Sequence, residues 1–342
     1  MKKKSKYNVA VVGVGVVGIE MIRCLKRRNF PIDNLKIFAR SSRVIDVDGQ
    51  KYQVEVISED GFDNIDIALF AGTEGEKGAA VVFAKTAVKH GAVVIDNGAD
   101  FRMDPNVPLV VPEVNACDIK KHKGIIANPN CSTVQMVVAI APIYKKVGIK
   151  RVIATTLQAS SGAGKAAVEQ LNQEVSLVYD TGFKNLQANA QNKVMPQQLA
   201  YNVFPQIGGF AECDFTSEEW KLVRETHKIM GDKKIKVSAT TVRVPVRTGH
   251  SESVYIETSK PISPDKVKAL LSKSAGIIVM DDPKRGLYPM PKDAEGKYEV
   301  FVGRIRKDPF VKNGLWLWVV ADNLLKGAAL NAVQIAEYLI AK

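Results

Sequence analysis

The stretch Gly13-Val14-Gly15-Val16-Val17-Gly18 decides the fold of the first part of the chain. It follows an apolar run at 7–12 that reads as a strand, and it opens a helix predicted over 16–28. In such a turn the first glycine permits the tight bend, the second lets the backbone approach a pyrophosphate, and the third lets helix and strand pack closely. Free N–H groups at the helix start attract phosphate. The stretch therefore predicts a dinucleotide site, with a glycine turn that binds no ligand as the alternative.

The rest of the first third alternates apolar strands with helical segments. Strands are predicted at 35–39, 53–56, 65–71 and 92–96, and a helix at 76–90. Continuous apolar strands between helices are typical of a parallel sheet that is covered on both faces. The predicted fold class is therefore α/β, with an N-terminal Rossmann-type dinucleotide-binding domain.

The segment after the second strand bears on the choice of cofactor. An NAD site places an acidic residue there for the ribose 2′-hydroxyl, and an NADP site places cations. Here the strand runs into Arg40-Ser41-Ser42-Arg43, and no acidic residue follows until Asp46. Cations and hydroxyls favour NADP over NAD, with a solvated basic turn as the alternative.

From about residue 131 the pattern changes to longer, alternating strands. Helices are predicted at 163–178, 217–230 and 264–273, strands at 236–246, 252–258, 298–306 and 315–320, and a long loop at 182–203. These strands predict an α+β domain with an antiparallel or mixed sheet, one face of which is exposed or paired with another subunit. Thr216 with Glu219, and Ser263 with Pro264, mark two of the helix starts.

The C-terminal segment predicts a discontinuous first domain. A terminal helix at 328–341 is expected to return to the first sheet. We predict an NADP-binding domain formed by 1–130 and 323–342, and a catalytic and dimerisation domain formed by 131–322.

Composition narrows the function classes. The chain has 342 residues, about two domains in length, and a formal net charge of +12, which attracts anions. Its four cysteines are scattered, so we expect free thiols, no metal site and a cytoplasmic protein. The basic N-terminus and the apolar run 9–19 imitate a secretory signal, but glycines interrupt the run and Glu20 and Arg23 follow it at once. No stretch is long enough to span a membrane.

A cysteine and a distant histidine form a candidate catalytic pair. Cys131 follows Asn128-Pro129-Asn130, a loop that enters an apolar helical run, so the thiol is expected near a helix N-terminus. That position lowers the pKa of a thiol and favours the nucleophilic thiolate. His250 lies in a tight connection between two strands, and such a histidine activates a thiol and moves protons. An inert, buried cysteine is the alternative.

The sequence resembles the aspartate-semialdehyde dehydrogenase family over nearly its whole length. The segments that carry the resemblance are Asn128-Pro129-Asn130-Cys131-Ser132-Thr133, Gln158-Ala159-Ser160-Ser161-Gly162-Ala163-Gly164, Arg243 through Glu252, Trp318-Val319-Val320-Ala321-Asp322-Asn323, and Asp96-Asn97 with Phe101-Arg102. The resemblance implies the reversible, NADPH-dependent reductive dephosphorylation of L-aspartyl 4-phosphate to L-aspartate 4-semialdehyde. This reaction belongs to the biosynthesis of lysine through diaminopimelate, of threonine and of methionine.

The resemblance also implies roles for individual residues. Cys131 attacks the acyl phosphate and forms a thioester, His250 serves as acid and base, and Gln158 orients the acyl group. The implied substrate-binding residues are Arg102, Asn130 and Lys221 for phosphate, Arg243 for the α-carboxylate and Glu218 for the ammonium group. The implied or predicted cofactor-binding residues are Gly13, Gly15, Val16, Val17, Gly18, Arg40, Ser41, Ser42, Arg43, Asn97, Ser161, Gly162 and Asn323.

Two departures from the family pattern lie on the cofactor side. The family turn reads Gly-x-x-Gly-x-x-Gly, whereas this chain has one residue fewer between its first two glycines. The family has Asn-Ser-Ser-Ala where this chain has Asn97-Gly98-Ala99-Asp100. Both departures bear on cofactor affinity and on the preference for NADP.

Two other readings of the sequence remain open. One is a related acyl-phosphate reductase of the N-acetyl-glutamyl-phosphate class, against which Asn130 and the 243–250 segment argue. The other is a nucleic-acid-binding protein on a retired enzyme fold, which the charge suggests but no motif supports. The expected partners are small-molecule substrates and a second copy of the chain in a homodimer, without nucleic acid or membrane.

Overall fold

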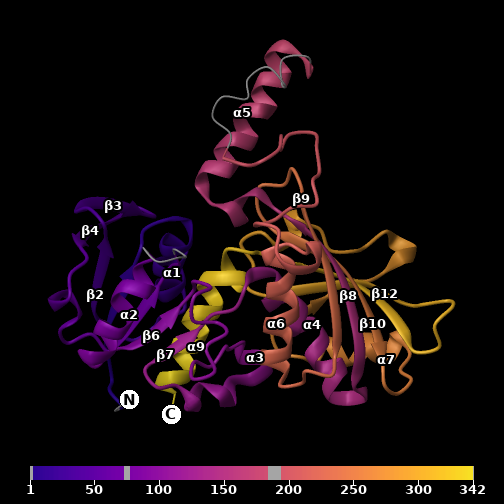
Figure 1. Ribbon diagram of the computed structural model, residues 1–342, viewed down its shortest axis with the longest axis horizontal. Helices are drawn as coiled ribbons and strands as arrows, with labels where there is room; N and C mark the ends of the chain where they lie inside the picture. Colours follow the sequence, from indigo (N-terminus) through magenta and orange to yellow (C-terminus); the bar gives the residue numbers. More distant parts are fainter. Residues whose placement is uncertain (1–2, 73–77, 184–193, 342) are drawn as a thin grey trace. The chain divides into compact units, whose positions relative to one another are not determined.

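The computed structural model describes residues 3–72, 78–183 and 194–341. These residues form two compact units (Figure 1). Unit 1 comprises Met1–Asn130, Lys228–Gly231 and Leu325–Lys342, and unit 2 comprises Cys131–His227 and Asp232–Leu324. The boundaries of the two predicted functional domains stay a prediction.

Unit 1 is built on a seven-stranded sheet in the order β3-β4-β2-β1-β5-β6-β7. Its strands are β1 (Tyr7–Val12), β2 (Ile32–Ala39), β3 (Arg43–Val47), β4 (Gln50–Val56), β5 (Ile67–Phe70), β6 (Val93–Asp96) and β7 (Ile125–Ala127). All pairs are parallel except β3 with β4. The predicted α/β fold is thus confirmed. The strand β1 is central, with β2 on one side and β5 on the other.

The sequence prediction omitted two strands of this sheet, β3 and β7, and placed the strand at 53–56 within the longer β4. Asp48 and Gly49 join β3 to β4, and both have positive φ, at 54° and 82°. A two-residue turn with two positive φ angles matches the twist of an antiparallel hairpin. The strand at 43–47 escaped detection because its side chains are mostly exposed and partly charged.

Helices pack against this sheet. They are α1 (Val16–Arg27), α2 (Ala79–Lys89), α3 (Pro112–Asn115), the 3-10 helices η1 (Asp60–Phe62) and η2 (Ala116–Lys121), the π-helix η8 (Leu325–Ala329) and α9 (Leu330–Ile340). The helix predicted at 76–90 is α2, and its first two predicted residues lie outside the described chain. The C-terminal helix α9 contacts α1 and β6.

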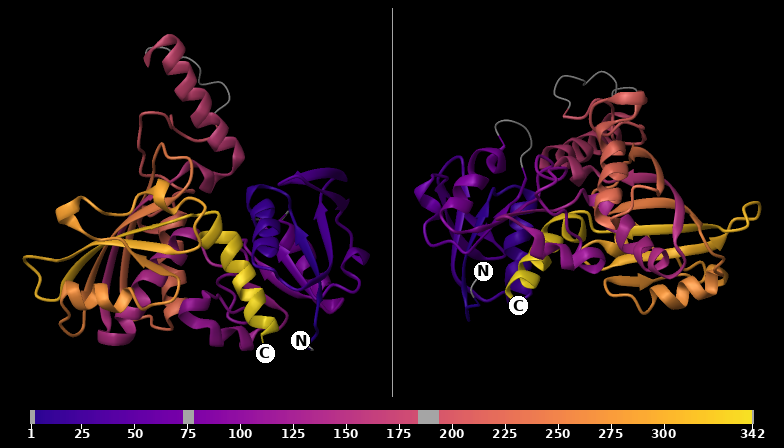
Figure 2. Two further views of the ribbon diagram at one scale, coloured as in Figure 1. Left: turned by 180° about the vertical axis from the view of Figure 1, so that it is seen from behind. Right: turned by 60° about the horizontal axis from the view of Figure 1, so that its bottom comes forward.

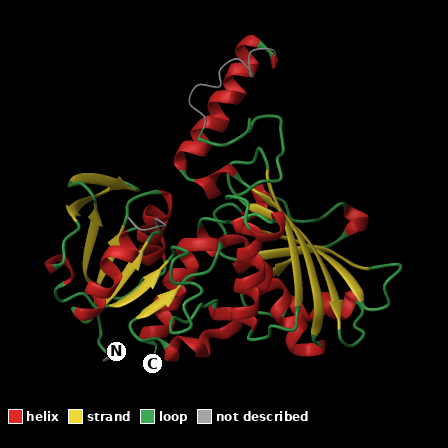
Figure 3. Cartoon of the chain, viewed as in Figure 1, coloured by secondary structure: helices red, strands yellow, loops and turns green. Residues whose placement is uncertain are grey.

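Unit 2 contains a six-stranded mixed sheet in the order β11-β12-β13-β10-β8-β9. The strands are β8 (Ile149–Gln158), β9 (Lys236–Arg243), β10 (His250–Thr258), β11 (Ile277–Val279), β12 (Val300–Lys307) and β13 (Gly314–Ala321), and Figure 3 shows them side by side. The pairs β8–β9 and β11–β12 are parallel and the others antiparallel. The predicted mixed sheet is confirmed.

The strand β8 was missed for a physical reason. Its burial alternates, but buried positions near its end are occupied by Thr156 and Gln158 rather than by apolar residues. The hydrophobic alternation that identifies a strand is therefore absent where the strand carries polar side chains inward.

The described helices of unit 2 are α4 (Cys131–Val147), α5 (Lys165–Thr181), α6 (Ser217–Met230), α7 (Pro264–Leu271), α8 (Pro291–Ala294) and the 3-10 helices η3 (Ser160–Ala163), η6 (Glu212–Asp214) and η7 (Pro283–Arg285). The predicted N-terminal caps of two of them, α6 and α7, are present. Thr216 N donates to Glu219 Oε2 at 2.7 Å and Glu219 N donates to Thr216 Oγ1 at 3.3 Å, a reciprocal cap. Ser263 Oγ accepts a hydrogen bond from the backbone of Lys266 at 3.3 Å.

One helix covers the sheet of unit 2 and another extends from it. The helix α4 contacts β8, β10, β12 and β13, so it lies across one face, called the inner face below. The helix α5 points away from the sheet, as Figures 1 and 2 show. In the long loop predicted at 182–203, residues 184–193 lie outside the described chain, and 194–203 form neither helix nor strand. No described helix is long and apolar enough to cross a membrane.

Candidate active site

The ends of three strands bring polar side chains together on the inner face of the unit 2 sheet. Gln158 ends β8, Arg243 ends β9, and His250 begins β10. Gln158 stands opposite Arg243 in the parallel register. Because β10 runs antiparallel to β8, its first residue lies at the same end of the sheet. All three side chains are buried, with exposed fractions of 2 %, 3 % and 0 %.

Cys131 is the first residue of α4, as the sequence predicted. Its side chain is partly exposed. The helix start offers N–H groups that stabilise negative charge on a thiolate. Burial lowers the pKa of the Arg243 guanidinium, and the charges of Cys131 and Glu218, which lie within electrostatic reach, oppose that effect. A cation beside the helix start further favours the thiolate over the thiol.

The histidine is held as a neutral ring. His250 Nδ1 faces the backbone N–H of Ala159 at 3.0 Å, so this nitrogen accepts and the ring proton sits on Nε2. Burial, and to a smaller extent the charge of Arg243, lowers the pKa of His250 well below its ordinary value. Nε2 has no hydrogen-bond partner within the described residues. The site therefore presents a donor N–H that is ready for a ligand.

Gly162 leaves room for this ring. A Cβ at this position would lie 3.0 Å from His250 Cε1, 3.1 Å from Nε2 and 3.3 Å from Arg243 Nη1. These contacts are tighter than most that real side chains make. The backbone at Gly162 thus passes directly against the imidazole, and a side chain there would displace it.

The buried guanidinium of Arg243 is fixed by backbone carbonyls. Its Nη1 donates to Ala159 O at 2.5 Å and to Gln158 O at 3.4 Å. Nε makes no hydrogen bond to any described residue. Arginine stays charged in proteins, so this group is a buried cation with donors left for an anion.

A second chain of contacts joins the neighbouring polar residues. Gln158 Nε2 donates to Glu218 Oε1 at 3.1 Å, and Thr156 Oγ1 donates to Gln158 Oε1 at 3.2 Å. Lys221 Nζ lies 3.5 Å from Glu218 Oε2, one turn along α6. The carboxylate thus stands between an amide and an ammonium group, in a position that also suits an amino group of a ligand.

The turn before His250 is tied to the segment that holds Ser161. Asn323 Oδ1 accepts a hydrogen bond from Gly249 N at 2.8 Å, and Asn323 Nδ2 donates to Ser161 Oγ at 3.0 Å. Unit 2 therefore gathers nine of the predicted site residues: Cys131, Gln158, Ser161, Gly162, Glu218, Lys221, Arg243, His250 and Asn323.

The remaining predicted residues belong to unit 1, where the glycine turn forms an open cradle. Gly13 has a positive φ of 100°, and a Cβ on Gly18 would lie 1.9 Å from the carbonyl oxygen of Gly13. Space is open around the Cα of Gly15, with nothing within 4 Å of an added Cβ. The helix α1 begins at Val16, with Val17 in its first turn, so amides face the cradle. The residues present fit a pyrophosphate, at the point where the strand order reverses.

The other unit 1 residues lie near the carboxyl ends of its strands. Arg40, Ser41, Ser42 and Arg43 are exposed after β2, and Arg43 Nη1 donates to Ser41 Oγ at 2.8 Å. Asn97, after β6, accepts at its carbonyl from Arg102 Nη2 at 2.9 Å.

Asn130 is buried and directly precedes Cys131 in the chain.

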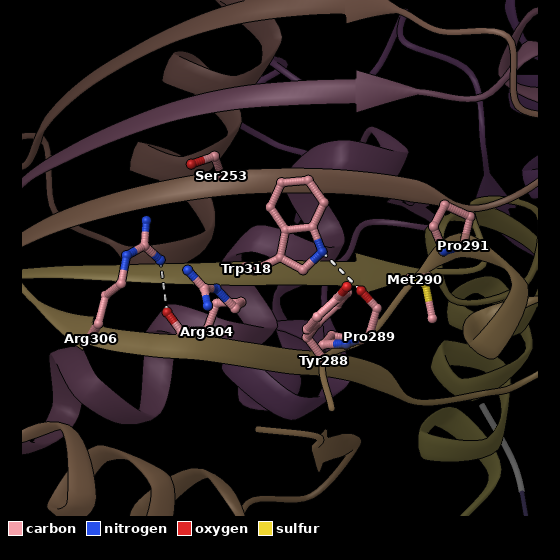
Figure 4. Close-up of a pocket in the computed structure, with 8 residues that line it drawn as sticks. All are labelled: Ser253, Tyr288, Pro289, Met290, Pro291, Arg304, Arg306 and Trp318. Carbon is pink, nitrogen blue, oxygen red and sulfur yellow. Dashed lines mark hydrogen bonds between the residues drawn. The ribbon is translucent and has the colours of Figure 1, made fainter. Parts of the chain in front are cut away.

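A cavity of about 540 Å³ lies elsewhere, on the opposite face of the unit 2 sheet. Figure 4 shows its lining, where Trp318 Nε1 donates to the carbonyl oxygen of Pro289 at 2.9 Å. The lining contains none of the predicted site residues. In the part of the chain that the structure describes, all four cysteines are free, and no three His, Cys, Asp or Glu side chains are grouped as metal ligands.

Family models match both parts of the chain. The semialdehyde dehydrogenase NAD-binding domain matches residues 8–122, and the semialdehyde dehydrogenase dimerisation domain matches residues 140–326. Aspartate-semialdehyde dehydrogenase of Aquifex aeolicus is 52% identical to the chain, with 98% of each covered. The chain belongs to the aspartate-semialdehyde dehydrogenase family. It is accordingly an oxidoreductase with an NAD(P)-binding domain.

Solved structures of aspartate-semialdehyde dehydrogenases agree with this fold. Aspartate semialdehyde dehydrogenase II from Vibrio cholerae, complexed with ASA, is 43% identical with a TM-score of 0.92 and covers 99% of both chains. Aspartate semialdehyde dehydrogenase from Candida albicans, with NADP, is 25% identical with a TM-score of 0.72 and covers 98% of both chains.

Two buried groups were not predicted from the sequence. Glu252 lies on the inner face beside His250, and Gln135 lies on α4 one turn after Cys131; both are 0 % exposed. The spacing of Glu252 from His250 in one strand was the available signal, because residues two apart share a face.

Proposed function

We propose that the chain catalyses the NADPH-dependent reductive dephosphorylation of L-aspartyl 4-phosphate to L-aspartate 4-semialdehyde through a thioester on Cys131. The observation that carries the proposal is the grouping of a thiol at a helix start, a neutral histidine, and a buried arginine on one sheet end. The complex of the Vibrio cholerae relative with ASA supports the same substrate.

The thiolate of Cys131 forms a bond to the acyl carbon, and the bond from that carbon to the phosphate oxygen breaks. Phosphate leaves with the electron pair. NADPH, when bound, supplies the hydride that reduces the thioester. The carbon–sulfur bond then breaks, which releases the aldehyde and returns the thiolate. The amides at the start of α4 stabilise negative charge on the reacting oxygen.

His250 acts through Nε2 in this scheme. The ring is neutral and carries its proton on Nε2, because Nδ1 accepts from Ala159. It therefore donates a hydrogen bond to the acyl oxygen as negative charge develops there, and it exchanges its proton as the oxygen is protonated and deprotonated.

The substrate is held at both ends by groups of opposite charge. Arg243 pairs with the α-carboxylate as a buried, charged donor. Glu218 receives the α-ammonium group, while Gln158, bonded to Glu218 at 3.1 Å, orients the acyl group. Lys221, with Arg102 and Asn130, serves the phosphate.

For the cofactor we propose NADP in preference to NAD. The glycine cradle at Gly13, Gly15 and Gly18 fits the pyrophosphate, and exposed Arg40 and Arg43 suit the 2′-phosphate. The Candida albicans relative with NADP supports this choice. Ser161, Gly162, Asn97 and Asn323 serve the nicotinamide side. The match to a dimerisation domain supports a homodimer.

The test is a spectrophotometric assay of phosphate-dependent NADP reduction with aspartate semialdehyde, run beside N-acetylglutamate semialdehyde. Cys131→Ser should lower kcat/KM by about a thousandfold or more, and His250→Ala by about a hundredfold or more. The exposed Cys117→Ser and the half-buried His122→Ala are matched controls that should retain activity. Turnover that Cys131→Ser leaves intact, or a preference for the N-acetylated aldehyde, would contradict the proposal.

A further inference from the structure

Glu252 is a buried carboxyl group that the proposed reaction does not use. It is 0 % exposed and lies two residues from His250 on the inner face, opposite Thr156 in the register of β8. Neither of its carboxyl oxygens makes a hydrogen bond of normal geometry to a described residue, and only the side-chain amide of Gln135 interacts with the group. An ionised carboxylate without partners is very costly in such a place, so the neutral acid is the stable form.

The group that faces Glu252 is the side-chain amide of Gln135. Burial raises the pKa of Glu252 well above its ordinary value, and the amide opposes this with a smaller effect. Gln135 Nε2 donates to the carbonyl oxygen of His250 at 3.4 Å, and its Oε1 also has no partner in the described chain. A neutral carboxylic acid carries an O–H donor. A proton donated from Glu252 to Gln135 Oε1 would give both groups a partner.

This pair joins the two elements that carry the proposed catalytic residues. Gln135 is on α4, whose first residue is Cys131, and Glu252 is on β10, whose first residue is His250. The helix α4 also buries many apolar side chains such as Val134, and apolar packing holds a helix against a sheet without fixing its direction. Hydrogen bonds are directional, so they fix the helix in one position along the strand.

We propose that Glu252, as a neutral acid, and Gln135 are positioning residues that set the placement of Cys131 relative to His250. Both act through the elements they join, and neither touches the substrate. The inference rests on the proposed function, because it assigns that spacing to a reaction between thiol, histidine and acyl group. A displacement of about 1 Å in a reacting group costs about a hundredfold in rate.

The test compares variants that differ in hydrogen bonding but not in volume. Glu252→Leu should lower kcat by about a hundredfold with KM within about threefold of the wild type. Glu252→Gln should stay within about threefold of wild-type kcat, because a carboxamide also donates to Gln135 Oε1. Ile256→Val, on the same face of β10 and farther from His250, is the control for a simple loss of packing and should keep full kcat.

The double variant Glu252→Leu/Gln135→Leu distinguishes an effect on the placement of Cys131 from an effect on the stability of the protein. Replacing both partners with apolar groups removes the orphaned amide oxygen, so the melting temperature should recover. On the proposal, kcat should stay low. Recovery of kcat together with the melting temperature would overturn it, as would wild-type kcat in Glu252→Leu, or a Glu252→Gln variant as slow as Glu252→Leu.

A readout without turnover distinguishes failure of this inference from failure of the proposed function. The rate of alkylation of Cys131 by iodoacetamide, followed by mass spectrometry of its peptide, should fall by about tenfold in Glu252→Leu and be unchanged in Glu252→Gln. A wild-type protein that does not act on aspartate semialdehyde refutes the proposed function. Equal alkylation rates in all variants overturn the inference.

Discussion

Lys326 is a buried cation whose removal should destabilise unit 1 severely. Its side chain is 0 % exposed, and Nζ donates to Glu113 Oε2 at 2.6 Å, Gln334 Oε1 at 2.7 Å and Asn331 Oδ1 at 3.0 Å. Burial lowers the pKa of Lys326, and the carboxylate of Glu113 opposes that effect. The three acceptors therefore compensate for the desolvation of the ammonium group.

Replacing Lys326 with Met keeps the length of the side chain but leaves the Glu113 carboxylate, which is 11% exposed, without its cation. Breaking one half of a buried pair costs about 3–5 kcal/mol, and that is the loss expected in the free energy of unfolding. The second variant Lys326→Met/Glu113→Gln removes the unpaired charge and should recover about half of the loss.

The assay is urea unfolding followed by far-UV circular dichroism, with hydrogen exchange at α9 to locate the change in unit 1. A surface ion pair, Lys121 with Asp118, provides the control, because Lys121→Met removes a solvent-screened contact and should leave the urea midpoint almost unchanged. A loss below about 1 kcal/mol in Lys326→Met, or no recovery in the double variant, would refute the reasoning.

Three further changes have definite expected outcomes. Gly162→Ala should lower kcat by about tenfold or more in the semialdehyde assay, since its Cβ would lie 3.0 Å from His250. Gly209→Ala is the control and should keep full kcat, because a Cβ at Gly209 meets nothing within 4 Å and its φ is not positive. The folded-state pKa of His250 is depressed, so this residue lowers stability as the pH falls below 6.5, because the unfolded chain binds the proton more readily; Glu252, whose pKa burial raises, acts in the opposite direction. His250→Gln should therefore gain stability relative to the wild type as the pH falls from 7 to 5 in melting curves, and a constant difference between the two proteins would contradict it. Arg43→Asp should raise KM for NADP by about tenfold while leaving KM for NAD within about threefold of the wild type. Equal changes in the two KM values would refute a contact between Arg43 and the 2′-phosphate.

The elements that local sequence determines were predicted well. β1 has the predicted bounds, and α1 ends one residue earlier than expected, because an apolar strand, a glycine turn and an amphipathic helix are local signals. The strand β3 at 43–47 was missed because its side chains are mostly exposed, and the strand β8 was missed because neighbours far along the chain decide it. β8 becomes a strand through its pairing with both β9 and β10.

The residues of the candidate site also differ in whether local sequence identifies them. Cys131, His250, the glycine turn at 13–18 and the basic segment at 40–43 were identified from the residues around them, and the remaining site residues from the resemblance. Glu252 and Lys326 were not identified, because charged side chains are usually exposed and nothing local marks these two as buried. Their burial follows from tertiary packing, of α4 on the sheet for the first and around η8 for the second.

The inner face of the unit 2 sheet changes character along its strands. At one end it carries Gln158, Arg243 and His250, and farther along β10 it carries Val254 and Ile256, which are fully buried. The polar site residues and the apolar core residues thus occupy successive positions along the same strands. Substitutions at the strand ends can therefore change the accepted acyl group, while the apolar positions farther along the strands continue to stabilise the fold.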